Sequence, residues 1–155
     1  MGAIVLSKDV PGTPEALFRT IISPTTWEHW FGIHHDFIGR PPECLTEGST
    51  LVSEILLHGM TEEVAWTVKT LDAPTHVALQ GFGQDGVRCD FTYHLQPSDT
   101  GTTVTAGIAF TGPLITKTVT KALEQRGYDD LDCTLGQLAE LAYALHGEPA
   151  QLSGM

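Results

Sequence analysis

The stretch "PGTPEALFRTIISPTTWEHWFG", residues 11–32, decides the fold because it follows an apolar strand directly and contains two helix starts. Thr13 precedes Pro14, and Ser23 precedes Pro24. A hydroxyl residue followed by proline is typical of a helix N-terminus, since the hydroxyl caps a free N–H group and proline has none to cap. The sequence therefore predicts two short helices, nearly end to end, each capped by its hydroxyl and together forming a V-shaped notch.

The second arm of this notch is unusually aromatic. Trp27, Trp30 and Phe31 expose more apolar surface than so short a helix can bury against itself. We therefore expect these three side chains to meet either the rest of the domain or a bound molecule.

The middle of the chain reads as strands. Residues 3–9 form a first one, residues 34–39 a less regular one, and five longer runs follow, rich in β-branched and aromatic residues. The five runs are "STLVSEILLHG", "EEVAWTVKTLD", "THVALQGFG", "GVRCDFTYHLQ" and "TTVTAGIAF". Short turns rich in Gly, Pro and Asp separate them, so the pattern predicts an antiparallel meander.

Alternation within the runs assigns the two faces of this sheet. Successive strand residues point to opposite sides, so one parity is buried and the other is wet. The inward set comprises Leu51, Ser53, Ile55, Leu57, Val64, Trp66, Val68, Val87, Cys89, Phe91, Tyr93, Leu95, Val104, Ala106, Ile108 and Phe110. An apolar face of this size needs a cover.

The last element supplies that cover. No proline occurs between Pro113 and Pro149, and apolar residues recur at helical spacing. These are Leu131, Leu135, Leu138, Ala142 and Leu145. We predict one long helix over residues 114–146, interrupted by Gly127, and a frayed tail.

Strand, helical pair, meander and long helix together indicate an α+β domain in which a curved antiparallel sheet of six to seven strands grips a C-terminal helix. The order of "PGTPEALFRTIISPTTWEHWFG", "LTEGSTLVSEIL", "VKTLDAPTHVAL" and "FTYHLQPSDTGTTVTAGIAF" resembles the START-like superfamily, which shares the helix-grip fold of Bet v 1-like allergens, polyketide cyclases and lipid-transfer domains. The resemblance covers nearly the whole chain. It implies a single domain over residues 1–147, followed by a flexible tail over residues 148–155.

A longer stretch, "LTEGSTLVSEILLHGMTEEVAWTVKTLDAP", is similar to an actinobacterial branch of that superfamily. Some members of this branch are classified as toxins of two-component toxin–antitoxin modules, and others as cyclase-like proteins. Fold does not decide between these roles, because function depends on the site that a fold carries.

The resemblance implies a cavity between the sheet and the last helix, with its mouth near the helical pair. Parity and helical spacing name the side chains that would line it, and such a pocket would be apolar and aromatic. The alternative is that the same side chains simply form a packed core. The candidates are Trp27, Trp30, Phe31, Ile55, Trp66, Phe91, Tyr93, Ile108, Phe110, Val119, Leu123 and Arg126.

The leading hypothesis is the binding of a lipid, fatty acid or polyketide-like molecule, with no cofactor. A cyclase, aromatase or dehydratase would need an acid–base pair beside its substrate. The inward set offers only Tyr93 and Ser53, with Arg126 on the helix. A third hypothesis is a toxin that acts through a small antitoxin-like protein partner. Lys117 and Lys121 share a helix face and could meet a ligand carboxylate, although a solvated face is the simpler interpretation.

Composition narrows the class further. With 8 Lys and Arg against 19 Asp and Glu, the chain has a formal net charge of -11, which disfavours nucleic acid and anionic membranes as partners. No apolar run suits a membrane span or a signal peptide, so we expect a cytoplasmic protein. The three cysteines are read as buried thiols: Cys44, Cys89 and Cys133.

Histidines raise one further alternative. "HWFGIHHD" brings His29, His34, His35 and Asp36 close in sequence, and imidazole with carboxylate can bind zinc. The spacing matches no zinc signature, and adjacent His34 and His35 would point to opposite sides of a strand. We therefore predict no metal site.

Overall fold

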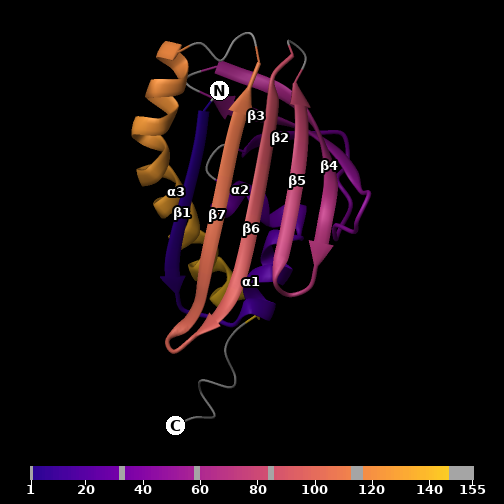
Figure 1. The fold of residues 1–155 in the computed structure, drawn as a ribbon. Helices are drawn as coiled ribbons and strands as arrows, with labels where there is room; N and C mark the ends of the chain where they lie inside the picture. Colours follow the sequence, from indigo (N-terminus) through magenta and orange to yellow (C-terminus); the bar gives the residue numbers. More distant parts are fainter. Residues whose placement is uncertain (1, 32–33, 58–59, 84–85, 113–116, 147–155) are drawn as a thin grey trace.

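A single antiparallel sheet of seven strands curls around the interior of the molecule, in the order β1-β7-β6-β5-β4-β3-β2. The computed structural model describes residues 2–31, 34–57, 60–83, 86–112 and 117–146. The strands run over Gly2–Val10 (β1), His34–Ile38 (β2), Thr50–Leu57 (β3), Met60–Asp72 (β4), His76–Gly83 (β5), Arg88–Ser98 (β6) and Gly101–Thr111 (β7). Figure 1 shows β1, β7, β6, β5 and β4 side by side, with β1 at one edge and with β3 and β2 behind them.

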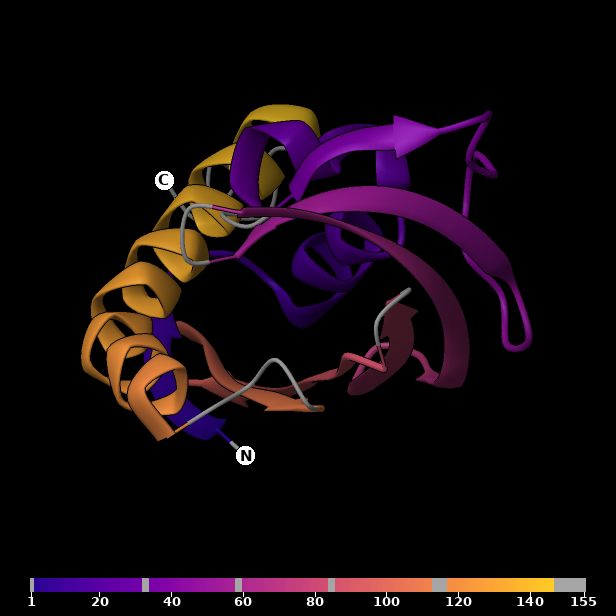
Figure 2. The same cartoon turned by 90° about the horizontal axis from the view of Figure 1, so that it is seen from above.

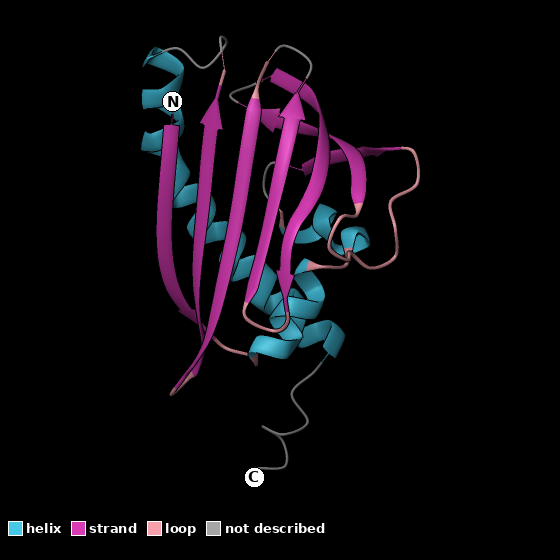
Figure 3. Ribbon diagram, turned by 45° about the vertical axis from the view of Figure 1, so that its right-hand side comes forward, coloured by secondary structure: helices cyan, strands magenta, loops and turns pink. Residues whose placement is uncertain are grey.

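The helices all lie on the concave side of this sheet (Figure 3). They are α1 (Pro14–Ile21), the 3-10 turn η1 (Pro24–Thr26), the single turn α2 (Trp27–Trp30) and the long α3 (Lys117–His146). Seen from above, α3 runs along the open side of the curl beside β1, and the α1–α2 segment lies inside the curve (Figure 2). The predicted helix-grip architecture, including the less regular strand at residues 34–39, is confirmed.

One of the two predicted helix caps is present. The Thr13 hydroxyl accepts a hydrogen bond from the Ala16 N–H at 3.1 Å, as expected of an N-cap. The Ser23 cap was wrong: its hydroxyl donates back to the Arg19 carbonyl at 2.7 Å, within the C-terminal turn of α1. The second arm is consequently a 3-10 turn and one α-helical turn rather than a helix of ordinary length.

The predicted parity of the strands is confirmed wherever the side chains are described. The inward residues of β6 are all at most 2% exposed, and Val64, Trp66 and Val68 on β4 are buried. Ile108 is half-buried, and the side chain of Leu57 lies outside the described residues. The turn from β4 to β5 contains a cis bond between Ala73 and Pro74.

The long helix meets the sheet mainly at its edge strand. Leu131, Leu135, Leu138 and Ala142 are buried, as their spacing predicted, whereas Leu145 is 53% exposed. Leu145 lies one residue before the end of α3. The predicted tail, 148–155, and residues 114–116 at the expected helix start lie outside the described residues.

An ion pair joins α3 to β1. The Lys8 Nζ atom lies 2.9 Å from Asp132 Oδ1, and Lys8 shares the inward parity of buried Ile4 and Val10. Because both groups are partly exposed, this pair contributes little to stability.

Candidate functional site

The concave face carries one continuous cluster of aromatic rings, centred on Phe91 of β6. The Phe91 ring centroid lies 5.0 Å from that of Phe31, 5.4 Å from that of Trp66 and 6.1 Å from that of Phe110, each in an edge-to-face arrangement. Pairing places Phe91 opposite Ile108 on β7. Rings from three strands and from the segment after α2 therefore meet at one point.

The notch supplies the other side of this aromatic cluster. Trp30 stacks on Phe31 with ring centroids 5.3 Å apart, and its edge meets Tyr93 at 6.1 Å. Trp27 packs edge-to-face on Phe31 at 5.3 Å. The three notch residues are at most 5% exposed, so the structure places them inside the domain and beside the strands.

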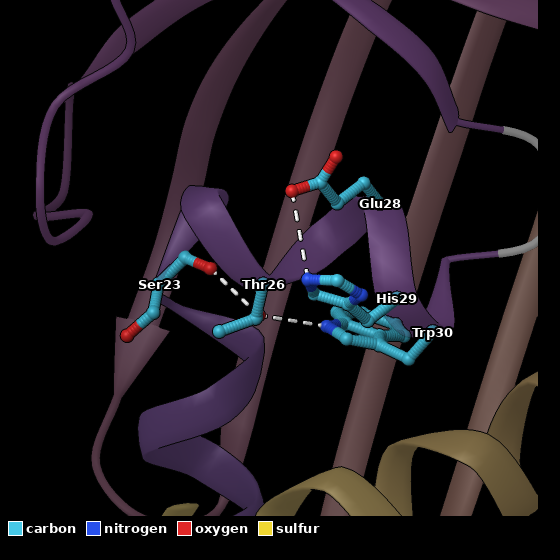
Figure 4. Close-up of polar contacts among 5 residues, drawn as sticks. All are labelled: Ser23, Thr26, Glu28, His29 and Trp30. Atoms are coloured by element: carbon cyan, nitrogen blue, oxygen red, sulfur yellow. Dashed lines mark hydrogen bonds and ion pairs between the residues drawn. The ribbon is translucent and has the colours of Figure 1, made fainter.

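The indole N–H groups of this cluster all have protein partners. The Thr26 hydroxyl joins the two arms of the notch. It accepts from Trp30 Nε1 at 2.9 Å, and its one proton is shared between the carbonyl groups of Ser23 and Thr20, whose oxygens lie 2.7 and 2.9 Å away. Figure 4 draws the contacts with Ser23 and Trp30. Trp27 Nε1 donates to the Ile21 carbonyl at 2.9 Å. The notch is thus held by its own hydrogen bonds.

The third indole is paired within the sheet. Trp66 Nε1 donates to Ser53 Oγ at 2.8 Å, and both residues are buried. Opposite Trp66 on β5 stands Gly81, where an added Cβ would lie 2.7 Å from Trp66 Cε3 and 2.6 Å from Val64 Cγ1. Gly81 thus makes room for the indole ring. Our sequence reasoning missed Gly81, although a glycine inside a strand pattern often marks such a close approach.

The Tyr93 hydroxyl differs from the three indole N–H groups in its hydrogen bonding. Tyr93 is 1% exposed, and its hydroxyl has no hydrogen-bond partner among the described residues. Burial raises the pKa of this phenol well above its usual value, because the phenolate would lose its solvation. The group is therefore neutral at physiological pH and able to donate.

His34 is a second polar group at the notch. Its ring lies 4.4 Å from Phe37 and 6.0 Å from Trp27, and its Nδ1 has no partner in the described structure. Burial lowers the pKa of His34, and nearby Asp36 partly opposes that shift. The half-buried imidazole is thus held in its neutral form more than an exposed one would be.

The remaining predicted lining residues divide into two groups. Ile55 and Phe110 are buried, and Ile108 keeps accessible surface although it points inward. The next inward residue on β7, Ala106, also adjoins Gly107 and is nevertheless fully buried. The missing side chain at Gly107 therefore does not explain the exposure of Ile108. The side chains of Val119, Leu123 and Arg126, and that of Lys117, lie outside the described residues.

The other polar candidates are either exposed or already hydrogen-bonded. Lys121 is exposed on α3, and Ser53, considered as an acid or base, is engaged by Trp66. Among the described residues no group of three or more His, Cys, Asp or Glu side chains could hold a metal ion. His29 instead lies 3.5 Å from Glu28 on the outside of the notch (Figure 4).

The prediction for the cysteines was right for one of the three. Cys89 is buried on the inward face of β6, and burial raises its pKa to about 12, so its thiol is unreactive at neutral pH. Cys44 and Cys133 are exposed. Cys44 lies in the β2–β3 connection and Cys133 on α3.

Fold and aromatic interior together define a helix-grip domain of the α+β class. The family described as polyketide cyclase / dehydrase and lipid transport matches residues 1–142, and the chain belongs to this family. None of the helices in the described ranges is long and apolar enough to cross a membrane.

Two mycobacterial proteins are related to this chain over most of its length. Rv1546 of Mycobacterium tuberculosis is 27% identical over 141 residues, which cover 91% of this chain and 99% of that protein. Toxin Rv0910 of the same species is 28% identical over 109 residues, covering 70% of this chain and 76% of the relative. The expected likeness to a branch that includes named toxins is therefore confirmed.

Solved structures share the fold at low sequence identity. TTHA0849 from Thermus thermophilus superposes with a TM-score of 0.71 at 14% identity, over 92% of this chain and 97% of that one. CV1439 from Chromobacterium violaceum gives 0.69 at 17% identity, over 92% and 98%. These likenesses establish the fold alone.

Proposed function

We propose that this protein binds a small hydrophobic or aromatic molecule, such as a lipid, a fatty acid or a polyketide-like compound, between the concave face of the sheet and α3. The family description names both cyclisation or dehydration of polyketides and transport of lipids. Both activities require a site for an apolar molecule. The proposal places that site at the aromatic cluster around Phe91.

The observation that carries the proposal is the accessible surface of Ile108. This residue points inward from β7, lies opposite Phe91, and stays half-buried while Ala106 and Phe110 on the same face are buried. An apolar ligand that covers the exposed part of Ile108 gains about 25 cal/mol for each Å² of that surface removed from water. The site would extend from there toward the start of α3.

Binding is favoured over catalysis by the polar groups of the interior. In the described part of the chain, the buried residues that carry a hydroxyl are Thr20, Thr26, Ser53, Thr102, Thr134 and Tyr93. No carboxylate or lysine is buried there, and the pKa values of Tyr93 and Cys89 are raised. A cyclase would need a positioned acid and base, so this enzyme class ranks second.

A role as a toxin is the third candidate, favoured by the likeness to Toxin Rv0910. Such a role would require recognition of a protein partner. Controlled expression in a bacterial host separates it from simple binding, because a toxin slows growth and its partner restores growth.

Substitution of Ile108 by Trp tests the binding proposal. The larger side chain would occupy the space beside Phe91, whereas the matched control Val5→Trp adds the same side chain at a site that is 63% exposed. We expect cis-parinaric acid, a fluorescent fatty acid, to bind saturably to the unmodified chain and to Val5→Trp. Ile108→Trp should bind at least about tenfold more weakly, a loss of about 1.4 kcal/mol.

Circular dichroism and thermal unfolding verify that both variants are folded. Failure of the unmodified chain to bind the probe would contradict the proposal. If folded Ile108→Trp bound the probe as tightly as the unmodified chain does, the proposed location of the site beside Phe91 would be wrong.

A further inference from the structure

We propose that the hydroxyl of Tyr93 donates a hydrogen bond to an uncharged acceptor oxygen of the bound molecule, so that the site selects carbonyl-bearing or ether-bearing apolar ligands over hydrocarbons of the same shape. This inference rests on the binding function proposed above. It adds the chemistry that the ligand must present.

The first argument compares the polar groups of the aromatic cluster. Trp27, Trp30 and Trp66 donate to Ile21 O, Thr26 Oγ1 and Ser53 Oγ at 2.8 to 2.9 Å. Tyr93 is equally buried, and its hydroxyl has no partner among the described residues. A buried hydroxyl without a partner costs about 1–3 kcal/mol, so a ligand that supplies an acceptor recovers part of that cost.

The second argument concerns the position of Tyr93. On β6 it stands one inward position from Phe91, and its pairing partner on β7 is Ala106, one inward position from Ile108. Its ring edge meets Trp30, which stacks on Phe31. The phenol therefore borders the same aromatic cluster that the proposed ligand would contact.

The third argument is electrostatic. The Tyr93 phenol stays neutral, since burial raises its pKa, and it therefore acts as a hydrogen-bond donor toward an oxygen. Within the described residues, the inward-facing ammonium is that of Lys8, which is already paired with Asp132 at 2.9 Å. A ligand carboxylate placed at Tyr93 would lack a described counter-charge, so the acceptor is an uncharged oxygen.

A pair of rigid probes isolates this contact. Fluorenone and fluorene have nearly the same shape, but only fluorenone carries a carbonyl oxygen. We expect the unmodified chain to bind fluorenone about five- to tenfold more tightly than fluorene, the ratio that one neutral hydrogen bond typically gives. Tyr93→Phe should abolish this preference and leave fluorene affinity unchanged or higher.

Tyr128→Phe is the matched control, because Tyr128 is 50% exposed on α3 and should leave the preference intact. Equal affinity of the unmodified chain for both probes would overturn the inference about Tyr93 while leaving the binding function standing. Failure of both probes to bind would overturn the inference about Tyr93, and the binding function would fall with it only if cis-parinaric acid also failed to bind. A preference that survives in Tyr93→Phe would assign the carbonyl contact to another group.

Unfolding without a ligand gives an independent readout. Because the phenol has no described partner, Tyr93→Phe should melt at the same temperature as the unmodified chain or higher. A melting temperature lowered by several degrees would show that the hydroxyl is already engaged inside the protein and would overturn the inference.

Discussion

The Trp66 end and the Tyr93 end of the concave face are both aromatic and buried, but they differ in what their polar atoms meet. At the first, the Trp66 indole donates to Ser53, and Gly81 leaves room for the ring. At the second, the Tyr93 hydroxyl is buried with no partner among the described residues. The polar atoms at the Trp66 end bond to each other within the sheet. The Tyr93 hydroxyl is the donor that we propose meets a ligand.

The largest expected effect comes from filling the space beside Trp66. Gly81→Ala places a Cβ 2.7 Å from Trp66 Cε3 and 2.6 Å from Val64 Cγ1, so the buried side chains must move. We expect a loss of about 1–3 kcal/mol in the free energy of unfolding, measured with urea.

Gly136→Ala provides a control of opposite sign. An added Cβ there meets only Lys8 Nζ at 3.9 Å, and alanine is the better helix former, so stability should rise by up to about 1 kcal/mol. Equal stability of Gly81→Ala and the unmodified chain would mean that the Trp66 end is loosely packed, and the comparison would fail.

A smaller effect is expected from Ser53→Ala, which removes the acceptor of the Trp66 indole. The N–H group would stay buried without a partner, at a cost of about 1–2 kcal/mol in unfolding free energy. Ser7→Ala is its control, because the Ser7 hydroxyl meets Thr105 Oγ1 at an exposed site on β1. If Ser53→Ala and Ser7→Ala lost the same small amount of unfolding free energy, the Trp66 indole would not depend on Ser53 for its stability.

The smallest expected effect lies on the outer face, where His76 and His94 stack with ring centroids 4.1 Å apart. Burial and the neighbouring His94 lower the pKa of His76, and Asp72 partly opposes that shift. A histidine with a folded-state pKa below its unfolded value binds fewer protons when folded. Its contribution to stability is therefore constant above the unfolded pKa of about 6.5 and declines as the pH falls below it.

Urea midpoints at pH 7.5 and 5.5 measure this effect, with His94→Gln as the comparison. The two proteins are otherwise identical in sequence, so the difference between them isolates the stacked pair. We expect the unmodified chain to lose more stability on acidification than His94→Gln does. Equal losses would show that the two rings do not interact electrostatically.

Much of the fold could be predicted from the sequence because its signals are local. Alternation along β6 put Cys89, Phe91 and Tyr93 on one face, and all three are buried. The sequence could not show that Ser23 fails to cap the second arm, because its hydroxyl also has access to the last turn of α1 and bonds to Arg19. Local spacing does not tell which of two backbone partners a side chain will choose.

The candidate site was predictable in its composition but not in its polar chemistry. The aromatic residues that meet at Phe91 follow from parity and from the notch motif. The hydrogen bond between Trp66 and Ser53 joins residues 13 positions apart in the chain, and it depends on the pairing of β3 with β4. That the Tyr93 hydroxyl has no partner among the described residues depends on every element packed around it, so no local pattern could reveal it.

The most direct test of ligand binding on the concave face uses the indole N–H resonances of the three tryptophans. Fluorenone is added to the isotopically labelled protein while ¹H–¹⁵N correlation spectra are recorded. We predict saturable shifts of the Trp30 and Trp66 indoles and of the Phe91 and Tyr93 amides, with Val5 on the outer face unchanged. Shifts confined to the outer face, or no shifts at saturating fluorenone, would contradict binding at this site.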